Sequence, residues 1–195
     1  MTTSDGGKRA LERAVRERCE AGELNVATTL AIESYGPEIL GFILALLRDE
    51  DDAREVFATF CEDLWRGVSA FRWSCSLRTW AYTLARHAVA RFQRDRTRRA
   101  NRHVPLSHAP EISQVVMQVT ASTPWYQKTE PRSRVARLRK SLSTDEHALL
   151  ILRNDRELAW PDIARVLDRD AAVLRKRYQR LLGRLRELYR AAGES

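Results

Sequence analysis

The chain is poor in the residues that build disulfide frameworks and zinc sites. Its three cysteines, Cys19, Cys61 and Cys75, are widely spaced, form no C-x-x-C pair and have no histidine pair nearby at zinc-binding spacing. An odd, scattered set of this kind argues against structural disulfides and for a reducing compartment. Cys61 falls on an apolar helical stripe, which predicts a packing role. A redox role for Cys75 stays open, because Arg72 and Arg78 flank it.

The usual marks of an enzyme are also missing. The four histidines (His87, His103, His108 and His147) have no serine, cysteine or carboxylate at a spacing that suggests a triad. The sequence has no glycine-rich phosphate-binding loop either. We therefore predict no catalytic residues, no metal, no cofactor and no small-molecule substrate. A nucleic-acid-processing enzyme is the weakest of the functions considered.

Long hydrophobic segments are scarce. The N-terminus has no apolar signal core, and the longest apolar run, residues 39–47, is too short to cross a bilayer. These observations predict a cytoplasmic protein without membrane insertion.

Positive charge is what the chain has in excess. Its 195 residues hold 34 Lys+Arg and 26 Asp+Glu, for a formal net charge of +8. This excess favours a polyanionic partner, with nucleic acid first and an acidic membrane surface second. The apolar fraction of 44% is enough for one large core or two small ones.

Helical periodicity recurs along the chain and no strand pattern is evident, so we predict an all-α protein with two small helical domains. Residues 1–24 form an N-terminal extension with a basic helix over 8–21, and residues 25–102 form the first domain. Residues 103–131 hold four of the six prolines and no helical period, which predicts a flexible linker, extended in places. Residues 132–195 form the second domain.

Within the first domain, Gly36-Pro37 is expected to separate a helix over 25–35 from a central apolar helix. An acidic helix over residues 49–66 follows. Its apolar stripe predicts a buried face, and its opposite face is either simply solvated or a docking surface for a basic partner. The sequence alone supports these two interpretations equally.

A basic, aromatic helix begins after Ser76, a plausible N-cap. The expected core stripe is Leu77, Trp80, Ala81, Leu84, Ala85, Ala88 and Phe92. The residues expected to face away from it, toward nucleic acid, are Arg78, Tyr82, Arg86, His87 and Arg94. Surface aromatic residues beside arginines suit stacking on unpaired bases and contact with phosphates. The arginines from Arg94 to Arg102 are expected to hold phosphates without regard to sequence.

The second domain carries a helix-turn-helix pattern. Ser143 and Glu146 fit a capping box, and a helix to about Asn154 follows. A short helix over 160–167, a turn over 168–170 capped by Asp170, and a basic helix over 171–191 complete the pattern. The candidates for reading bases in the major groove lie early on the last helix: Arg175, Lys176, Gln179 and Arg180.

The order of these parts resembles bacterial RNA polymerase sigma factors. The resemblance covers about residues 30–100 and 138–190. Two segments carry the resemblance: SLRTWAYTLARHAVARF and ELAWPDIARVLDRDAAVLRKRYQRLLGRLREL. The chain looks most like the small extracytoplasmic-function (ECF) group, which keeps only regions 2 and 4. The resemblance implies a cytoplasmic bacterial protein with two partners. One is core RNA polymerase, bound at the polymerase's β′ clamp helices and β flap, and the other is promoter DNA. An anti-sigma factor is a further partner that it implies.

The resemblance also implies roles for individual residues. The polymerase-facing positions on the acidic helix would be Glu55, Ala58, Thr59 and Glu62. The family usually has an Asp-x-x-Gln-Glu set there, so Ala58 and Thr59 depart from it. The loop that captures a flipped base of the −10 element would be Arg72, Trp73, Ser74, Cys75 and Ser76. His87 stands where the family often has Asn, and the four residues on the last helix match the face that contacts the −35 element.

Two interpretations follow from these residues. The leading one is a promoter-specificity factor that binds core polymerase, recognises the −35 and −10 elements and helps to melt the −10 region. The alternative is a helix-turn-helix regulator, or degenerate sigma-like protein, that binds DNA without recruiting polymerase. The changes at Ala58 and Thr59 support the alternative.

Overall fold

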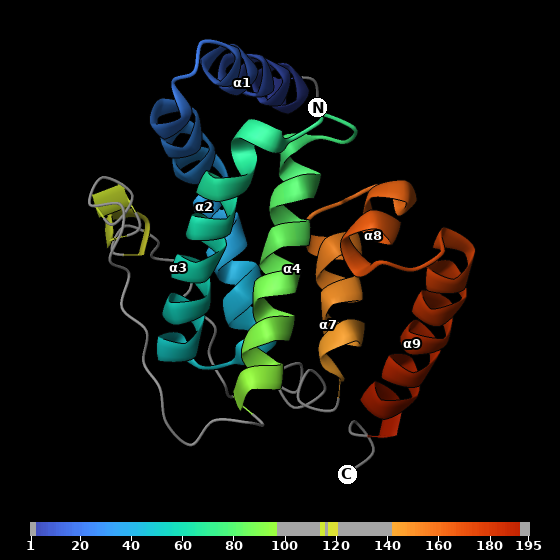
Figure 1. The fold of residues 1–195 in the computed structure, drawn as a ribbon. Helices are drawn as coiled ribbons and strands as arrows, with labels where there is room; N and C mark the ends of the chain where they lie inside the picture. The colour runs from blue at the N-terminus through green and yellow to red at the C-terminus, as the bar shows by residue number, and fades with distance from the viewer. Residues whose placement is uncertain (1–2, 97–113, 116, 121–141, 192–195) are drawn as a thin grey trace. The chain divides into compact units, whose positions relative to one another are not determined.

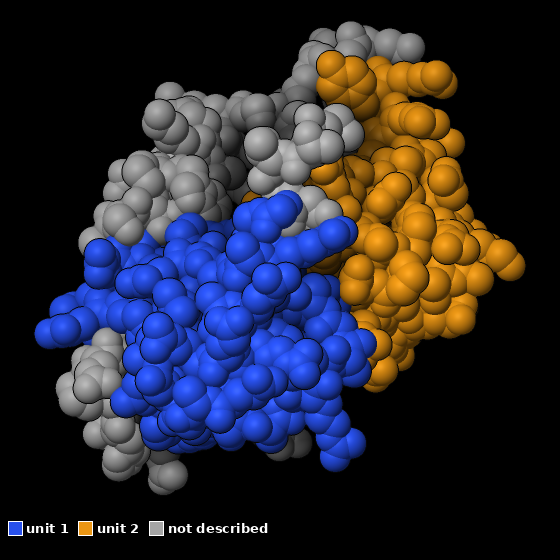
Figure 2. All heavy atoms as spheres, turned by 90° about the horizontal axis from the view of Figure 1, so that it is seen from above, with its two compact units in different colours: residues 1–123 blue, residues 124–195 orange. Residues whose placement is uncertain are grey.

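The chain folds into two compact units, Met1–Thr123 and Pro124–Ser195 (Figure 2). The computed structural model describes residues 3–96, 114–115, 117–120 and 142–191. Almost all of this described part is helical and none of it is strand, which confirms the all-α prediction.

The first unit is a helical bundle. It contains α1 (Thr3–Glu20), α2 (Leu24–Leu47), α3 (Glu50–Gly67), the short 3-10 helix η1 (Val68–Ala70) and α4 (Leu77–Arg96). Helices α2, α3 and α4 pack against one another, and α1 lies across the end of the bundle where the α3–α4 loop also lies (Figure 1). Gly22, with a positive φ of 78°, follows the end of α1.

Helix α2 runs without a break through Gly36 and Pro37, so the predicted separation into two helices was wrong. Proline inside a helix costs about 3 kcal/mol, but apolar residues on both sides of it, including Ile32 and Ile39, are buried in the core. This packing outweighs the local penalty. Gly36 itself is buried, and a Cβ there would lie 3.2 Å from a Val119 methyl carbon.

The continuous α2 also changes the expectation about membranes. At 24 residues it is long and apolar enough to cross a bilayer by length and composition, whereas the run 39–47 alone was judged too short. However, 56% of its most apolar stretch is buried inside the unit, against the other helices. The core helix of a soluble bundle passes the same test, so its length is weak evidence for a membrane span.

Helix α3 starts and packs as its sequence predicts. The Asp49 carboxylate accepts a hydrogen bond from the Asp52 backbone nitrogen at 2.9 Å, and acidic residues fill the first turn. Its apolar stripe is buried, and burial raises the pKa of the Cys61 thiol well above its ordinary value. A buried, protonated thiol on this stripe fits the predicted packing role.

Part of the predicted linker is ordered. Residues 114–115 and 117–120 are helical, and Val119 is only 5% exposed because it contacts α2 at Gly36. The prediction of a segment with no helical structure was therefore wrong here. The rest of the 103–131 segment lies outside the described residues.

The second unit has the predicted helix-turn-helix. Helix α7 (Thr144–Leu150) continues into a π-helical turn, η3 (Ile151–Asp155), and α8 (Trp160–Leu167) and α9 (Ala171–Ala191) follow. Asp168, between α8 and α9, adopts the left-handed conformation (φ 49°, ψ 53°). The Asp170 carboxylate caps α9 by accepting hydrogen bonds from the backbone nitrogens of Ala172 (2.8 Å) and Val173 (3.1 Å).

Candidate nucleic-acid interface

An aromatic cluster shapes the loop between η1 and α4. The Phe71 ring stacks on Trp80, with centroids 4.5 Å apart, and contacts Trp73 at 4.8 Å. Trp80 in turn covers Gly67, where an added Cβ would lie 3.0 Å from the indole. Trp73 has a positive φ of 54°, which is a strained conformation for a large aromatic residue. The cluster therefore holds Trp73 in a conformation that its own backbone disfavours.

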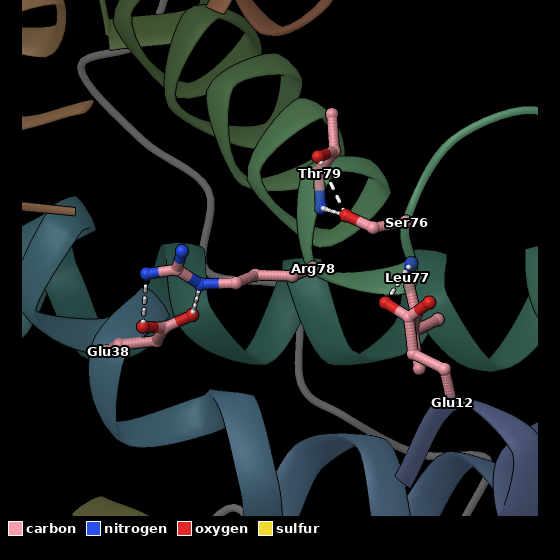
Figure 3. A network of polar contacts seen from close by, with 6 residues as sticks. All are labelled: Glu12, Glu38, Ser76, Leu77, Arg78 and Thr79. Carbon is pink, nitrogen blue, oxygen red and sulfur yellow. Dashed lines mark hydrogen bonds and ion pairs between the residues drawn. The ribbon is translucent and has the colours of Figure 1, made fainter. Parts of the chain in front are cut away.

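Two side chains, one from the preceding loop and one from α1, accept hydrogen bonds from backbone nitrogens at the N-terminus of α4. The Ser76 hydroxyl accepts a hydrogen bond from the Thr79 backbone nitrogen at 3.0 Å, as the N-cap prediction requires. Glu12, on α1, accepts one from the Leu77 nitrogen at 2.8 Å (Figure 3). Burial raises the pKa of Glu12, although the backbone hydrogen bonds oppose this. Helix α1 is thus tied directly to the start of the candidate DNA-binding helix.

Arg78 faces the bundle, not solvent, which corrects the sequence prediction. Its guanidinium donates from Nε and Nη2 to the two carboxylate oxygens of Glu38 on α2, at 2.7 and 2.9 Å (Figure 3). Only 14% of the Arg78 side chain is exposed. Burial opposes its charge, but the ion pair with Glu38 outweighs burial and raises the Arg78 pKa.

Tyr82 is also a core residue, contrary to prediction. It is 0% exposed, and its ring meets Phe42 of α2 edge to face, with centroids 5.1 Å apart. Val89 is buried too, whereas Trp80, Leu84 and Phe92, from the predicted core stripe, are only partly buried. The buried face of α4 is therefore rotated around the helix axis from the predicted stripe.

The rotation leaves a different basic face on α4. His87 and Arg94 are exposed and Arg86 is partly exposed, as expected, but exposed Arg91 was missed. Arg91 pairs with Asp63 on α3, and Arg96 pairs with Asp52 at 2.7 Å. Arg91 is four residues after His87, and this spacing could have indicated that the two lie on the same face of α4. The arginines from 98 to 102 lie outside the described residues.

Three of the four predicted polymerase-facing residues on α3 remain accessible. Glu55 is exposed, and Thr59 and Glu62 are partly exposed, but Ala58 is only 7% exposed and belongs to the core. The Thr59 hydroxyl donates to the Glu55 carbonyl oxygen at 3.1 Å. Ala58 therefore contributes to packing, and the accessible face is narrower than predicted.

In the second unit, the predicted residues share the outer face of α9: Arg175, Lys176, Gln179 and Arg180 are all exposed. Trp160 of α8 fixes the start of this helix. The guanidiniums of Arg153 and Arg175 lie 5.3 and 5.8 Å from its ring, and Tyr178 meets it edge to face at 5.6 Å. The Tyr178 hydroxyl donates to Asn154 at 2.5 Å. The turn geometry and this cluster together orient the basic face.

A capping box begins the second unit, as predicted. The Ser143 hydroxyl accepts from the Glu146 nitrogen at 3.3 Å, and Glu146 accepts from the Ser143 nitrogen at 2.9 Å. Arg184 of α9 adds an ion pair with Glu146 at 2.7 Å. Burial disfavours the charge of Glu146, but these hydrogen bonds outweigh it and lower its pKa below the ordinary 4.5.

Substituting Glu146 is expected to give a pH-dependent loss of stability in the second unit. Because the folded-state pKa is lowered, the stabilisation is present above the unfolded-state pKa and is lost as pH falls through the folded-state value. Glu146→Ala should cost about 1 kcal/mol above the unfolded-state pKa of this carboxyl and progressively less as the pH falls below it. Hydrogen exchange of the α7 amides, compared with wild type at each pH, measures this difference. Asp145→Ala is the matched control, with a cost of a few tenths of a kcal/mol; an equal loss in both variants would contradict the prediction.

Within the described part of the chain, no three His, Cys, Asp or Glu side chains are grouped to hold a metal ion. His147 is buried and His87 is exposed, while His103 and His108 lie outside the described residues.

Comparison with known proteins finds a family match within the first unit and a similar solved structure. Residues 31–99 match the family model for sigma-70 region 2. The fold is similar to that of the sigma factor RpoE from Bartonella quintana, solved in complex with the anti-sigma factor NepR. The TM-score is 0.60 and the identity 17%, and the match covers 82% of this chain and 94% of that one. Among curated proteins, no sequence matches the chain.

Region 2 accounts for the α2–α4 bundle, because the matched segment runs from the middle of α2 past the end of α4. Helix α1 precedes it. The first unit therefore contains a segment that matches sigma-70 region 2, and the fold is similar to that of a solved sigma factor.

Proposed function

We propose that the chain binds core RNA polymerase, directs it to promoters through the −35 and −10 elements, and helps to melt the −10 region. The observation that carries this proposal is the region 2 bundle, in which an aromatic loop leads into a helix with a basic outer face. No bond-making chemistry belongs to the chain in this proposal. It supplies binding energy and position, and the polymerase makes the RNA.

The −10 element would be held as single-stranded DNA by the α3–α4 loop and α4. Unstacking one base costs a few kcal/mol, and stacking on an aromatic side chain returns about 1–3 kcal/mol. Trp73 supplies the aromatic face, and Arg72, Ser74, Cys75 and Ser76 surround it. Arg86, His87, Arg91 and Arg94 would contact the strand and its phosphates; Arg78 and Tyr82 would act only through the fold.

The −35 element would be bound as duplex by the second unit. The exposed start of α9 includes Arg175, Lys176, Gln179 and Arg180, whose side chains can pair with guanine, phosphate and adenine groups. Contact with core polymerase would use the accessible face of α3, where Glu55 and Glu62 present negative charge. By analogy with the Bartonella complex, an anti-sigma factor would bind the chain and inhibit it.

Transcription from purified components tests the proposal. The chain, mixed with active core polymerase and a library of genomic promoter fragments, should start transcripts at defined sites. No initiation by a core enzyme that works with another sigma factor would contradict it. Sequencing the starts would give the two promoter elements directly.

The alternative is a DNA-binding regulator that does not recruit polymerase. The burial of Ala58 favours it, since one of the four family positions for the polymerase contact is closed. Pull-down against core polymerase separates the two functions, because only a promoter-specificity factor forms the complex. DNA binding without a polymerase complex would support the alternative.

Trp73→Ala is expected to reduce open-complex formation about tenfold or more, because it removes the stacking surface for one base. Permanganate footprinting of the melted −10 region with holoenzyme measures the effect. The matched control is Trp65→Ala, which removes a partly buried indole of α3 that donates to Asn25 at 2.9 Å and does not line the cavity beside the loop. Equal melting by wild type and Trp73→Ala would contradict the stacking role.

A further inference from the structure

A cavity of about 460 Å³ opens beside the α3–α4 loop, and half of its lining comes from α1. The residues that line it are Glu12, Arg13 and Arg16 from α1 and Trp73, Cys75 and Ser76 from the loop. This helix precedes the segment that matches sigma-70 region 2, so the family match assigns it no role. The cavity is the size of a small-ligand site.

The chemistry of the lining suits a nucleotide. The Arg16 guanidinium lies over the Trp73 ring, 5.8 Å from its centroid. An aromatic face opposed by a planar cation can hold a flat, polar ring by stacking on one side and cation–π attraction on the other. Arg13, also exposed on α1, adds a second guanidinium with hydrogen-bond geometry that suits phosphate oxygens.

Helix α1 is held in register with the loop by a separate contact. Glu12 accepts a hydrogen bond from the Leu77 nitrogen, at the point where the loop becomes α4 (Figure 3). Because Glu12 and Arg16 are one helical turn apart, this contact places Arg16 on the same side of α1, toward the loop. Displacing the Arg16 side chain costs little, since it is 57% exposed and its ion pair with Glu20 lies at the surface.

We propose that α1 forms one wall of the site for an unpaired promoter nucleotide, with the base between Trp73 and Arg16 and its phosphate at Arg13. Arg16 is then a specificity-determining residue of the −10 interaction. In the free protein Arg16 covers the Trp73 ring, and an incoming base takes the place between them. This inference rests on the proposed function and adds α1 to its DNA-binding surface.

The experiment selects promoters with holoenzyme from a duplex library randomised over both elements. Wild type, Arg16→Ala and Arg16→Lys are compared, with Lys8→Ala as matched control because it removes one exposed charge from α1 outside the cavity. Arg16→Ala is expected to reduce the base preference at one −10 position about tenfold and to leave the −35 preference unchanged. The base preference of Arg16→Lys should fall between those of wild type and Arg16→Ala, because lysine keeps the charge and loses the planar group. Lys8→Ala should match wild type.

The outcomes separate this inference from the proposed function. If Arg16→Ala selects the wild-type motif, or loses affinity uniformly as a lost surface charge would, the α1 wall is wrong while the sigma factor function stands. If wild type forms no holoenzyme or selects no motif, the proposed function fails and this inference fails with it. Hydrogen exchange of the α4 amides, unchanged in Arg16→Ala, shows that any effect does not come from unfolding.

Discussion

Replacing Tyr82 with alanine is expected to lower the free energy of unfolding of the first unit by about 3–5 kcal/mol. Tyr82 is among the largest wholly buried side chains, and its ring meets Phe42 of α2 edge to face. The substitution removes this contact and leaves a cavity between α2 and α4. Urea denaturation followed by circular dichroism measures the loss, and hydrogen exchange in α2 and α4 locates it.

Tyr82→Phe is the matched control, because it keeps the ring and its contact with Phe42. We expect it to cost within about 1.5 kcal/mol and to leave DNA binding by the holoenzyme at the wild-type level. If Tyr82 lay on the DNA-facing side, as its place in the sequence first suggested, Tyr82→Ala would weaken DNA binding while stability stayed unchanged. That result would contradict the buried position.

Local signals in the sequence were sufficient for most of the helix boundaries. The caps at Asp49, Ser76 and Asp170 and the capping box at Ser143 depend on residues within three positions of one another. The left-handed turn at Asp168 is local too. Backbone geometry and hydrogen bonding over one helical turn decide such features, so a single sequence contains the information.

Distant contacts decided the features that the sequence did not reveal. Which side of α4 is buried depends on Glu38 and Phe42, which lie 40 residues before their partners on α4. The amphipathic pattern of α4 allows two rotations of the helix, because aromatic residues lie on both candidate faces. Continuity of α2 through Pro37 has the same origin, since packing against other helices outweighs the local break.

Part of the candidate site could be predicted from the sequence. The loop from Arg72 to Ser76 was predicted as a site from the family resemblance, and the basic face of α9 from the capped turn before it. The wall that α1 adds was not foreseen, since Glu12 and Leu77 are 65 residues apart and no spacing rule connects them. Arg91 was missed because the predicted face was rotated.

Replacing Glu38 with alanine is expected to destabilise the first unit by about 3 kcal/mol, because it leaves the half-buried Arg78 charge without its partner. The Glu38 and Arg78 side chains are 22% and 14% exposed. The double variant Glu38→Leu with Arg78→Met should recover most of the loss, since a buried ion pair and an apolar pair of similar volume differ little. Urea denaturation measures both. Glu20→Ala, which breaks the exposed pair with Arg16, is the control and should cost under about 0.5 kcal/mol.

The same pair decides whether Arg78 contacts DNA. A phosphate-binding arginine, when removed, lowers the salt dependence of DNA binding by about one counterion. Arg78→Ala is expected to leave that slope unchanged and to weaken binding only in proportion to the unfolded fraction, whereas Arg94→Ala should reduce the slope by about 1. Titrating salt in holoenzyme binding to a single promoter distinguishes the two variants. A reduced slope with Arg78→Ala, together with a Glu38→Ala cost no larger than that of Glu20→Ala, would mean that Arg78 leaves Glu38 to hold phosphate. With that result, Arg78 would contact DNA directly. With an unchanged slope, Arg78 acts by holding α4 against α2, so that His87, Arg91 and Arg94 face outward.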